Sequence, residues 1–390
     1  MILSYGATNF YSFREAMSVS LELNSKVPKA ISKGKKASTV LGVKGANASG
    51  KTNILKGLNF IAEFVSSSFS WDGKRPIRFY SFFDSKESSD FYIDFEIDGV
   101  YYSYEFETNG HQILREVLYK KVSRKTRLYE RVNNTITYRV SDLAGLDLME
   151  LKSSASVISS SAMYKIKQGL PDLKEIHRYF SFVVGNVHSV GVLGDEVYTP
   201  ERAAEFFSGD SEALEFAKSI IKNCDLGILD IKIHKTTRAD GEQEYYPTFL
   251  HEAQSVDSVE RRWLTSWDES SGTMALFRRL YLYWVVLSVG GVLVMDEFDI
   301  NCHSMLLPLL VGLFLDPKTN PHDAQFIFTA HSSEIIDFLG KYRIILVGKE
   351  SGESFCYRLD EVPGDLIRND RSISSLYRDG KIGGVPKIER

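Results

Sequence analysis

The sequence predicts an α/β protein: a mixed sheet flanked by helices, with an antiparallel β-subdomain and an inserted, mainly helical lobe. Three observations support this prediction. A glycine-rich loop lies between a short apolar strand and a helical pattern, and two later apolar runs end in polar residues, as buried parallel strands do. Residues Phe91–Phe106 alternate between apolar and polar like a β-hairpin with an Asp98-Gly99 turn.

Composition excludes several classes of protein. The 390 residues are 43% hydrophobic and 25% charged, which excludes disordered and collagen-like chains. The three cysteines, Cys224, Cys302 and Cys356, lie far apart, which excludes a disulfide framework and fits a reducing compartment. The chain opens without a secretory pattern, and its longest uncharged stretch, Leu280–Met295, is shorter than a membrane helix. We therefore expect a cytoplasmic protein without a membrane segment.

The chain divides into three predicted regions. Residues 1–140 hold strand patterns and the glycine-rich loop, and they form the first part of the main domain. Residues 141–225 carry helical patterns and form the inserted lobe, and residues 226–390 complete the main domain. We read Leu280–Met295 as a buried helix that ends near Ser288, a Gly-Gly turn and a buried strand, Val292–Met295.

The strongest signal is the segment Gly45-Ala-Asn47-Ala-Ser-Gly50-Lys51-Thr52, which matches G-x-x-x-x-G-K-[ST]. Glycines let successive backbone N–H groups point inward at phosphates, and the following helix adds its positive N-terminal end. Lys51 would neutralise β/γ-phosphate charge, and the Thr52 hydroxyl would bind Mg²⁺. The pattern predicts a P-loop for ATP and Mg²⁺.

Two downstream strands end in polar side chains. The run Val292–Met295 is followed by Asp296 and Glu297, which at the C-terminal edge of a sheet would hold the Mg²⁺ shell and polarise the attacking water. The run Ala324–Thr329 is followed two residues later by His331, which could hydrogen-bond the γ-phosphate. Between the P-loop and these strands, Ser271 and Gly272 open an apolar helix and form a candidate anion site.

The order P-loop, Ser-Gly helix, Asp-Glu strand, His strand resembles ABC-type ATPases of the SMC, RecF and OLD kind, and most closely the subgroup found in bacterial phage-defence operons. The stretches that carry the resemblance are the Asn9-Phe10 and Ser12-Phe13 pairs, GANASGKTN at 45–53, DLGI at 225–228, ESSGT at 269–273, MDEFDINCHS at 295–304, FTAHS at 328–332 and GKIGGVPKI at 380–388. The resemblance implies two ATPase heads that dimerise around two ATPs. Ser271 and Gly272 of one head would contact the γ-phosphate held by the other, with Asp299 at the seam.

The sequence departs from these relatives in several respects. Ser270-Ser-Gly-Thr273 differs from the signature of transport ATPases, and no glutamine follows a strand soon after the P-loop helix, so the residue that completes Mg²⁺ coordination stays open. Phe10 or Tyr11 could stack on adenine or pack in the core. The chain contains no D-x-D pair, and too few residues follow His331 for the Toprim nuclease of OLD proteins. Cleavage of nucleic acid would need a partner.

One segment is rich in basic residues. Eight Lys and Arg side chains lie between Arg115 and Arg139, interleaved with tyrosines, as a surface that tracks a DNA or RNA backbone requires. The alternative is the solvated face of a hairpin. The net charge of -4 gives no whole-chain attraction to nucleic acid.

Two functions are consistent with the sequence. The first is an ATPase switch in anti-phage defence: the heads dimerise or assemble into a higher homo-oligomer on ATP, and this controls a separate effector, a nuclease or toxin. The second is a RecF-like or SMC-like ATPase that binds DNA directly in repair or maintenance. The complete ATP site without a second catalytic site favours the first function, and the basic hairpin favours the second.

Overall fold

The computed structural model describes residues 1–164, 170–194, 197–224, 227–254, 259–300, 303–362, 367 and 372–384. These residues form three larger sheets, together with a two-stranded hairpin of β10 (Val187–His188) and β11 (Gly191–Val192). None of the helices within these residues combines the length and apolar character needed to cross a membrane. The expected α/β class is confirmed.

The central sheet has the strand order β18-β17-β3-β16-β15-β9, and all its neighbours are parallel except β17 and β18. Its strands are β3 (Val40–Gly45), β9 (Val183–Gly185), β15 (Val292–Met295), β16 (Gln325–Thr329), β17 (Ile344–Glu350) and β18 (Glu353–Arg358). Every residue of β15 and β16 is buried, because helices cover both faces of the sheet.

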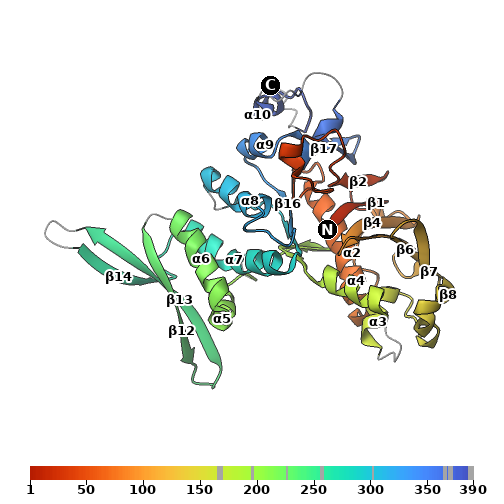
Figure 1. The fold of residues 1–390 in the computed structure, drawn as a ribbon, viewed down its shortest axis with the longest axis horizontal. Coiled ribbons are helices and arrows are strands. Elements are labelled where there is room, and N and C mark those ends of the chain that lie inside the picture. Colours follow the sequence, from red (N-terminus) through yellow and green to blue (C-terminus); the bar gives the residue numbers. More distant parts are fainter. Residues whose placement is uncertain are drawn as a thin grey trace.

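Alternate residues of each central strand enter two different hydrophobic cores. Val292 and Val294 pack with α2 (Lys51–Ser67) and the β-subdomain, whereas Leu293 and Met295 pack on the opposite face. That second face is covered by α7 (Ser271–Val289), α8 (Leu307–Leu315) and α9 (Glu334–Leu339). The C-terminal helix α10 (Ile373–Arg378) lies beside α9 (Figure 1).

The β-subdomain is an antiparallel sheet of seven strands in the order β2-β1-β4-β5-β6-β7-β8. Its strands are β1 (Ile2–Thr8), β2 (Met17–Ser20), β4 (Ser89–Ile97), β5 (Val100–Thr108), β6 (Ile113–Lys121), β7 (Lys125–Val132) and β8 (Thr135–Arg139). One face packs on α2, where the rings of Phe64 and Phe106 stack with centroids 4.4 Å apart. The expected Asp98-Gly99 turn joins β4 and β5, and both residues have positive φ.

A separate unit projects from the central sheet, and we call it the arm (Figure 1). It comprises α5 (Pro200–Gly209), α6 (Ser211–Cys224) and a three-stranded antiparallel sheet of β12 (Ile228–Thr237), β13 (Gln243–Gln254) and β14 (Val259–Thr265). Phe207 of α5 and Phe249 of β13 both contact the ring of Phe277, with centroids 5.4 and 5.5 Å apart. Helix α7 therefore joins the arm to the central sheet.

The grouping of elements differs from the expected inserted lobe at 141–225. The first part of that range stays with the main domain, because α3 (Val157–Met163) and α4 (Pro171–Ser181) pack against α2 and β9 pairs with β15. The projecting unit instead combines α5 and α6 with a sheet that the sequence assigned to the main domain. Asp225 and Leu226, at the expected boundary, lie outside the described residues.

Candidate active site

The P-loop connects β3 to α2 at the C-terminal edge of the central sheet. Gly50 has φ +111° and Ala48 has φ +61°, so the chain turns sharply before the helix begins. A Cβ on Gly45 would lie 2.5 Å from the carbonyl oxygen of Val347, which leaves room only for glycine. Among the described residues no side chain caps the N-terminus of α2, which leaves its first N–H groups available as a candidate anion site.

Lys51 is buried at the base of the P-loop. Its ammonium donates hydrogen bonds to the carbonyl oxygens of Gly45 and Ala46, at 3.1 and 3.0 Å. Burial lowers the pKa of Lys51, while the carboxylates of Asp296 and Glu297 act in the opposite direction. Asn47 is exposed at the tip of the loop. Lys51, the side chain expected to bind the phosphates, therefore bonds to the backbone of the P-loop itself in this structure.

The structure brings Thr52 and Asp296 together from sequence positions far apart. The Thr52 hydroxyl donates to Asp296 Oδ2 at 2.8 Å, and Asp296 is only 7% exposed. The other carboxylate oxygen, Oδ1, accepts from the Thr329 hydroxyl at 2.5 Å. A hydroxyl and a carboxylate in contact are hard oxygen donors of the kind that Mg²⁺ prefers, so these residues fit the expected metal.

Glu297 and His331 also meet at this edge of the sheet. His331 Nε2 lies 3.0 Å from Glu297 Oε1, and both side chains are about half exposed. Glu297 has φ +49°, and its backbone N–H donates to the Thr329 hydroxyl at 2.7 Å. A carboxylate and an imidazole held together and open to solvent can orient and deprotonate a water molecule.

The Ser-Gly segment lies at the N-terminus of α7. The Ser270 hydroxyl caps this helix by accepting from the N–H of Thr273 at 3.0 Å, whereas Ser271 is exposed. Within the described residues, no hydrogen bond joins Ser271 or Gly272 to the P-loop of the same chain. Just before this segment, a turn presents the Trp267 side chain, which is 93% exposed.

The turn that precedes the Ser-Gly segment is fixed on both sides. The Asp268 carboxylate accepts from the backbone N–H and the hydroxyl of Thr265, at 3.1 and 2.7 Å. Glu269, whose side chain is 3% exposed, lies 2.6 Å from His251 Nε2 of β13. The exposed position of Trp267 is therefore a defined feature of the surface between β14 and α7.

The two candidates for adenine stacking differ in accessibility. Phe10 is fully buried, with ring centroids 5.6 to 6.4 Å from those of Phe60, Phe79 and Phe91, and so packs in the core. Tyr11 is partly exposed; its hydroxyl donates to the Ser189 carbonyl at 2.7 Å, and burial raises its pKa. Phe10 therefore serves the core, which was one of its two expected roles.

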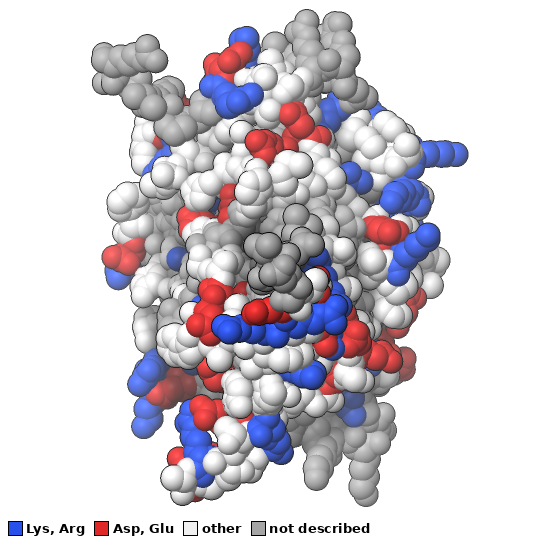
Figure 2. Space-filling view, turned by 90° about the vertical axis from the view of Figure 1, so that its left-hand side faces the viewer, with Lys and Arg blue, Asp and Glu red and all other residues white. Residues whose placement is uncertain are grey.

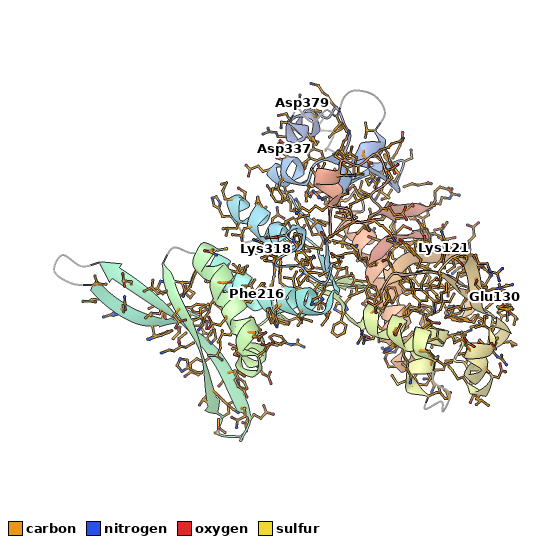
Figure 3. All side chains as sticks on the ribbon, in the orientation of Figure 1. Lys121, Glu130, Phe216, Lys318, Asp337 and Asp379 are labelled. Carbon is orange, nitrogen blue, oxygen red and sulfur yellow. The ribbon has the colours of Figure 1, made fainter. Side chains whose placement is uncertain are left out.

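The basic segment is largely neutralised by neighbouring carboxylates. Arg131 is completely buried and contacts Glu116 at 3.3 Å, so it does not belong to a surface. Five other members have acidic partners: Arg115 and Arg127 with Glu130, Lys120 with Asp172, Lys125 with Glu105, and Arg139 with Asp147. Figure 3 shows Lys121 and Glu130 in the β-subdomain, on the opposite side of the molecule from Phe216 of the arm. The segment presents mixed charge.

Three contacts of the site were not expected from the sequence. Thr329 bridges Asp296 and Glu297, and Asn186 pairs its side-chain amide with the backbone N–H and carbonyl of Asp296, at 2.8 and 3.0 Å. Lys44 contacts the loop of His331. Asn186 directly follows β9, and the short apolar run before Gly185-Asn186 was the one available signal for this strand end.

Comparisons with known proteins place this geometry in a family. No curated protein matches the chain significantly. Among solved structures, the SMC head domain from Thermotoga maritima aligns with 14% identity and a TM-score of 0.44, covering 92% of this chain and 98% of that one. A structure of the recombination mediator RecF with a nucleotide analogue aligns with 8% identity and a TM-score of 0.37, covering 91% and 98%.

The model of one protein family matches residues 40–337, which include the P-loop, Asp296, Glu297 and His331. This match spans most of the chain and confirms the expected AAA family of ATPases. The chain therefore belongs to the family described as AAA domain, putative AbiEii toxin, Type IV TA system.

Proposed function

We propose that this protein binds ATP with Mg²⁺ and hydrolyses it at the site between β3, β15 and β16. The observation that carries the proposal is the joining of Thr52 to Asp296 and of Glu297 to His331 at one edge of the sheet. The P-loop N–H groups and Lys51 would bind the phosphates, and Thr52 and Asp296 would hold the metal. When bound, Mg²⁺ would neutralise phosphate charge.

Each side chain then has a role in hydrolysis. Glu297 accepts a proton from the attacking water, because its carboxylate is solvent-accessible and its backbone is fixed by Thr329. His331 orients Glu297 through the 3.0 Å contact of Nε2, and its other ring nitrogen, when it also carries a proton, donates to the γ-phosphate. Lys51 gives up its two carbonyl partners for phosphate oxygens.

We further propose that the heads associate when ATP is bound. Ser271 and Gly272 would contact the γ-phosphate held by a second copy, which agrees with the absence of described hydrogen bonds to the P-loop of their own chain. The exposed Trp267 indole lies beside this segment on a fixed turn, and large aromatic side chains at such positions anchor protein interfaces. Association would bury the Trp267 indole, which is exposed to water in the single chain.

The output that we propose is control of a separate effector, a nuclease or toxin, in cytoplasmic anti-phage defence. The family description names a putative AbiEii toxin of a type IV TA system, which supports a role alongside a second component. Figure 2, which faces the end of the arm, shows a short row of basic side chains with acidic side chains around it, and a surface of mixed charge supports a protein partner. The alternative, a DNA-binding ATPase for repair or maintenance, is favoured by Lys121 and Arg124, which have no acidic partner among the described ion pairs of the basic segment.

Glu297→Gln tests the ATPase and head association together. The variant should bind ATP, lose at least about 100-fold in turnover because the base is gone, and run at twice the monomer mass or more with ATP and Mg²⁺. Glu350→Gln, an exposed glutamate at the end of β17, is the control and should behave like wild type. Wild-type turnover by Glu297→Gln would remove Glu297 from its role, and an unchanged mass would refute head association.

The output is tested with the ATP-trapped protein. A stable complex with the product of a neighbouring nuclease or toxin gene, formed only with ATP, would support the effector. Salt-dependent binding of the trapped protein to duplex DNA, lost on reversing the charges of Lys121 and Arg124, would support the alternative instead. Lys51→Ala is the reference for both measurements, because it should not bind ATP.

A further inference from the structure

Lys44 is a buried lysine on β3, one residue before the P-loop. It is 3% exposed, and its ammonium donates to three backbone carbonyls, those of Ala330, His331 and Ser332, at 2.6, 2.9 and 3.0 Å. A lysine ammonium has three N–H donors and no acceptor, so these three carbonyls satisfy it completely. The ring of Tyr377 in α10 lies 5.7 Å from the ammonium.

The loop that carries His331 is held from its other side by Asp299. Asp299 Oδ2 accepts from the backbone N–H groups of His331 and Ser332, both at 2.8 Å. The peptide group between Ala330 and His331 thus has its carbonyl on Lys44 and its N–H on Asp299, and the next peptide group repeats the pattern. Two successive peptide dipoles lie between a cation and an anion, which favours one orientation of this loop.

We propose that Lys44 is a positioning residue that couples the P-loop strand to the loop of His331. The inference rests on the proposed function, because it gives His331 a part in ATP hydrolysis. Lys44 precedes Gly45 directly, so a shift of the P-loop on binding phosphate reaches the carbonyls of residues 330–332 through one side chain. His331 in turn sets the position of Glu297.

The ammonium of Lys44 is desolvated, and its neighbours compensate for this by charge and by hydrogen bonds. Burial lowers its pKa to about 8, while the Asp299 carboxylate acts to raise it. A desolvated ammonium is costly unless it is fully hydrogen-bonded, and removing it would leave three carbonyls without a donor. Lys44→Met keeps the length of the side chain and removes only the donors.

The kinetic test is a double-mutant cycle of Lys44→Met and His331→Ala. Lys44→Met should lower kcat about 10- to 100-fold, as misplacement of a catalytic group does, while the Kd for ATP changes less than about threefold. In the His331→Ala background, Lys44→Met should cost less than about threefold more, because the residue that it positions is gone. Multiplicative losses, or a loss of ATP binding equal to the loss of kcat, would overturn the proposal.

A second measurement does not depend on ATPase activity. Amide hydrogen exchange of ligand-free protein should be faster at His331 and Ser332 in Lys44→Met, with strands β4 and β5 unchanged. Exchange that rises equally in β4 and β5 would indicate general destabilisation and overturn the proposal, and so would unchanged exchange at His331 and Ser332. Lys349→Met, an exposed lysine of β17, is the control. If the wild type does not hydrolyse ATP, the proposed function fails, and hydrogen exchange still decides whether Lys44 holds the loop.

Discussion

Replacing Thr329 by valine removes one hydroxyl that holds both members of the acidic pair. Thr329 is fully buried, donates to Asp296 Oδ1 at 2.5 Å and accepts from the N–H of Glu297 at 2.7 Å. Valine has nearly the same volume, so the change opens no cavity and deletes only these two hydrogen bonds. Asp296 then loses one of the two hydroxyl groups that orient its carboxylate and keeps that of Thr52.

The size of the effect follows from the two lost contacts. A hydrogen bond to a carboxylate contributes about 1.5–3 kcal/mol, and a buried N–H left without a partner costs about 1–3 kcal/mol. We expect the free energy of unfolding to fall by about 3 kcal/mol. Loss of a partner that orients a metal ligand weakens metal binding about 10- to 100-fold. The Mg²⁺ concentration for half-maximal ATP binding should rise by that factor.

The assay is ATP binding followed across a Mg²⁺ titration, with Thr329→Ser as the matched variant. Serine keeps the hydroxyl and loses a methyl group, so it should cost about 1 kcal/mol in stability and leave the Mg²⁺ dependence near that of wild type. Equal Mg²⁺ dependence in the valine and serine variants would refute the role that we give to the hydroxyl.

Two further predictions concern stability. Arg131→Met leaves the buried Glu116 carboxylate without its cation and should lower the free energy of unfolding in urea by about 3–5 kcal/mol. The control Arg127→Met, on the same strand and 40% exposed, should lower it by less than about 1 kcal/mol. Similar losses in the two variants would contradict the buried pair. A contact with Glu63 raises the pKa of His188, and hydrogen bonds from His188 and Ser189 lower the pKa of Glu63 although its burial acts the other way. This pair therefore stabilises the fold fully between about pH 4.5 and 6.5 and loses that stability as pH rises through the folded pKa of His188 or falls through that of Glu63. His188→Ala should lower the urea midpoint more at about pH 5.5 than at pH 9, and an equal loss at both would count against the pair.

The sequence predicted those parts of the site that combine a fixed residue pattern with an apolar strand. The P-loop between β3 and α2, the acidic pair after β15 and His331 after β16 each have such a pattern, and parallel strands bring their ends to one edge. The α/β class follows from the same strands.

Other contacts leave no pattern in the sequence. Lys44 reads as an ordinary strand lysine, because its partners are backbone carbonyls, which every residue type carries. Strand β9 has only three residues, so its place beside β15 depends on tertiary pairing. The arm sheet was missed because β14 is exposed on both faces and so lacks a clear alternation. In the sequence Arg131 looks like a surface arginine, because the carbonyls that enclose its side chain in the fold, those of Lys152 and Ala155, belong to a later segment.

The length of α7 and its short connection to the central sheet bear on how the arm can move. It is continuous from Ser271 to Val289, about 28 Å long, and only Gly290 and Gly291 separate it from β15, the strand that Asp296 follows. A Cβ on either glycine would lie 2.5–2.6 Å from a neighbouring carbonyl oxygen, so this joint is packed backbone to backbone. If the helix tilted as a rigid body about its end at the sheet, a tilt of about 5° would move its far end by about 2.5 Å. Under the proposed function, a small adjustment of this edge of the sheet on binding ATP would be carried along the helix to the arm.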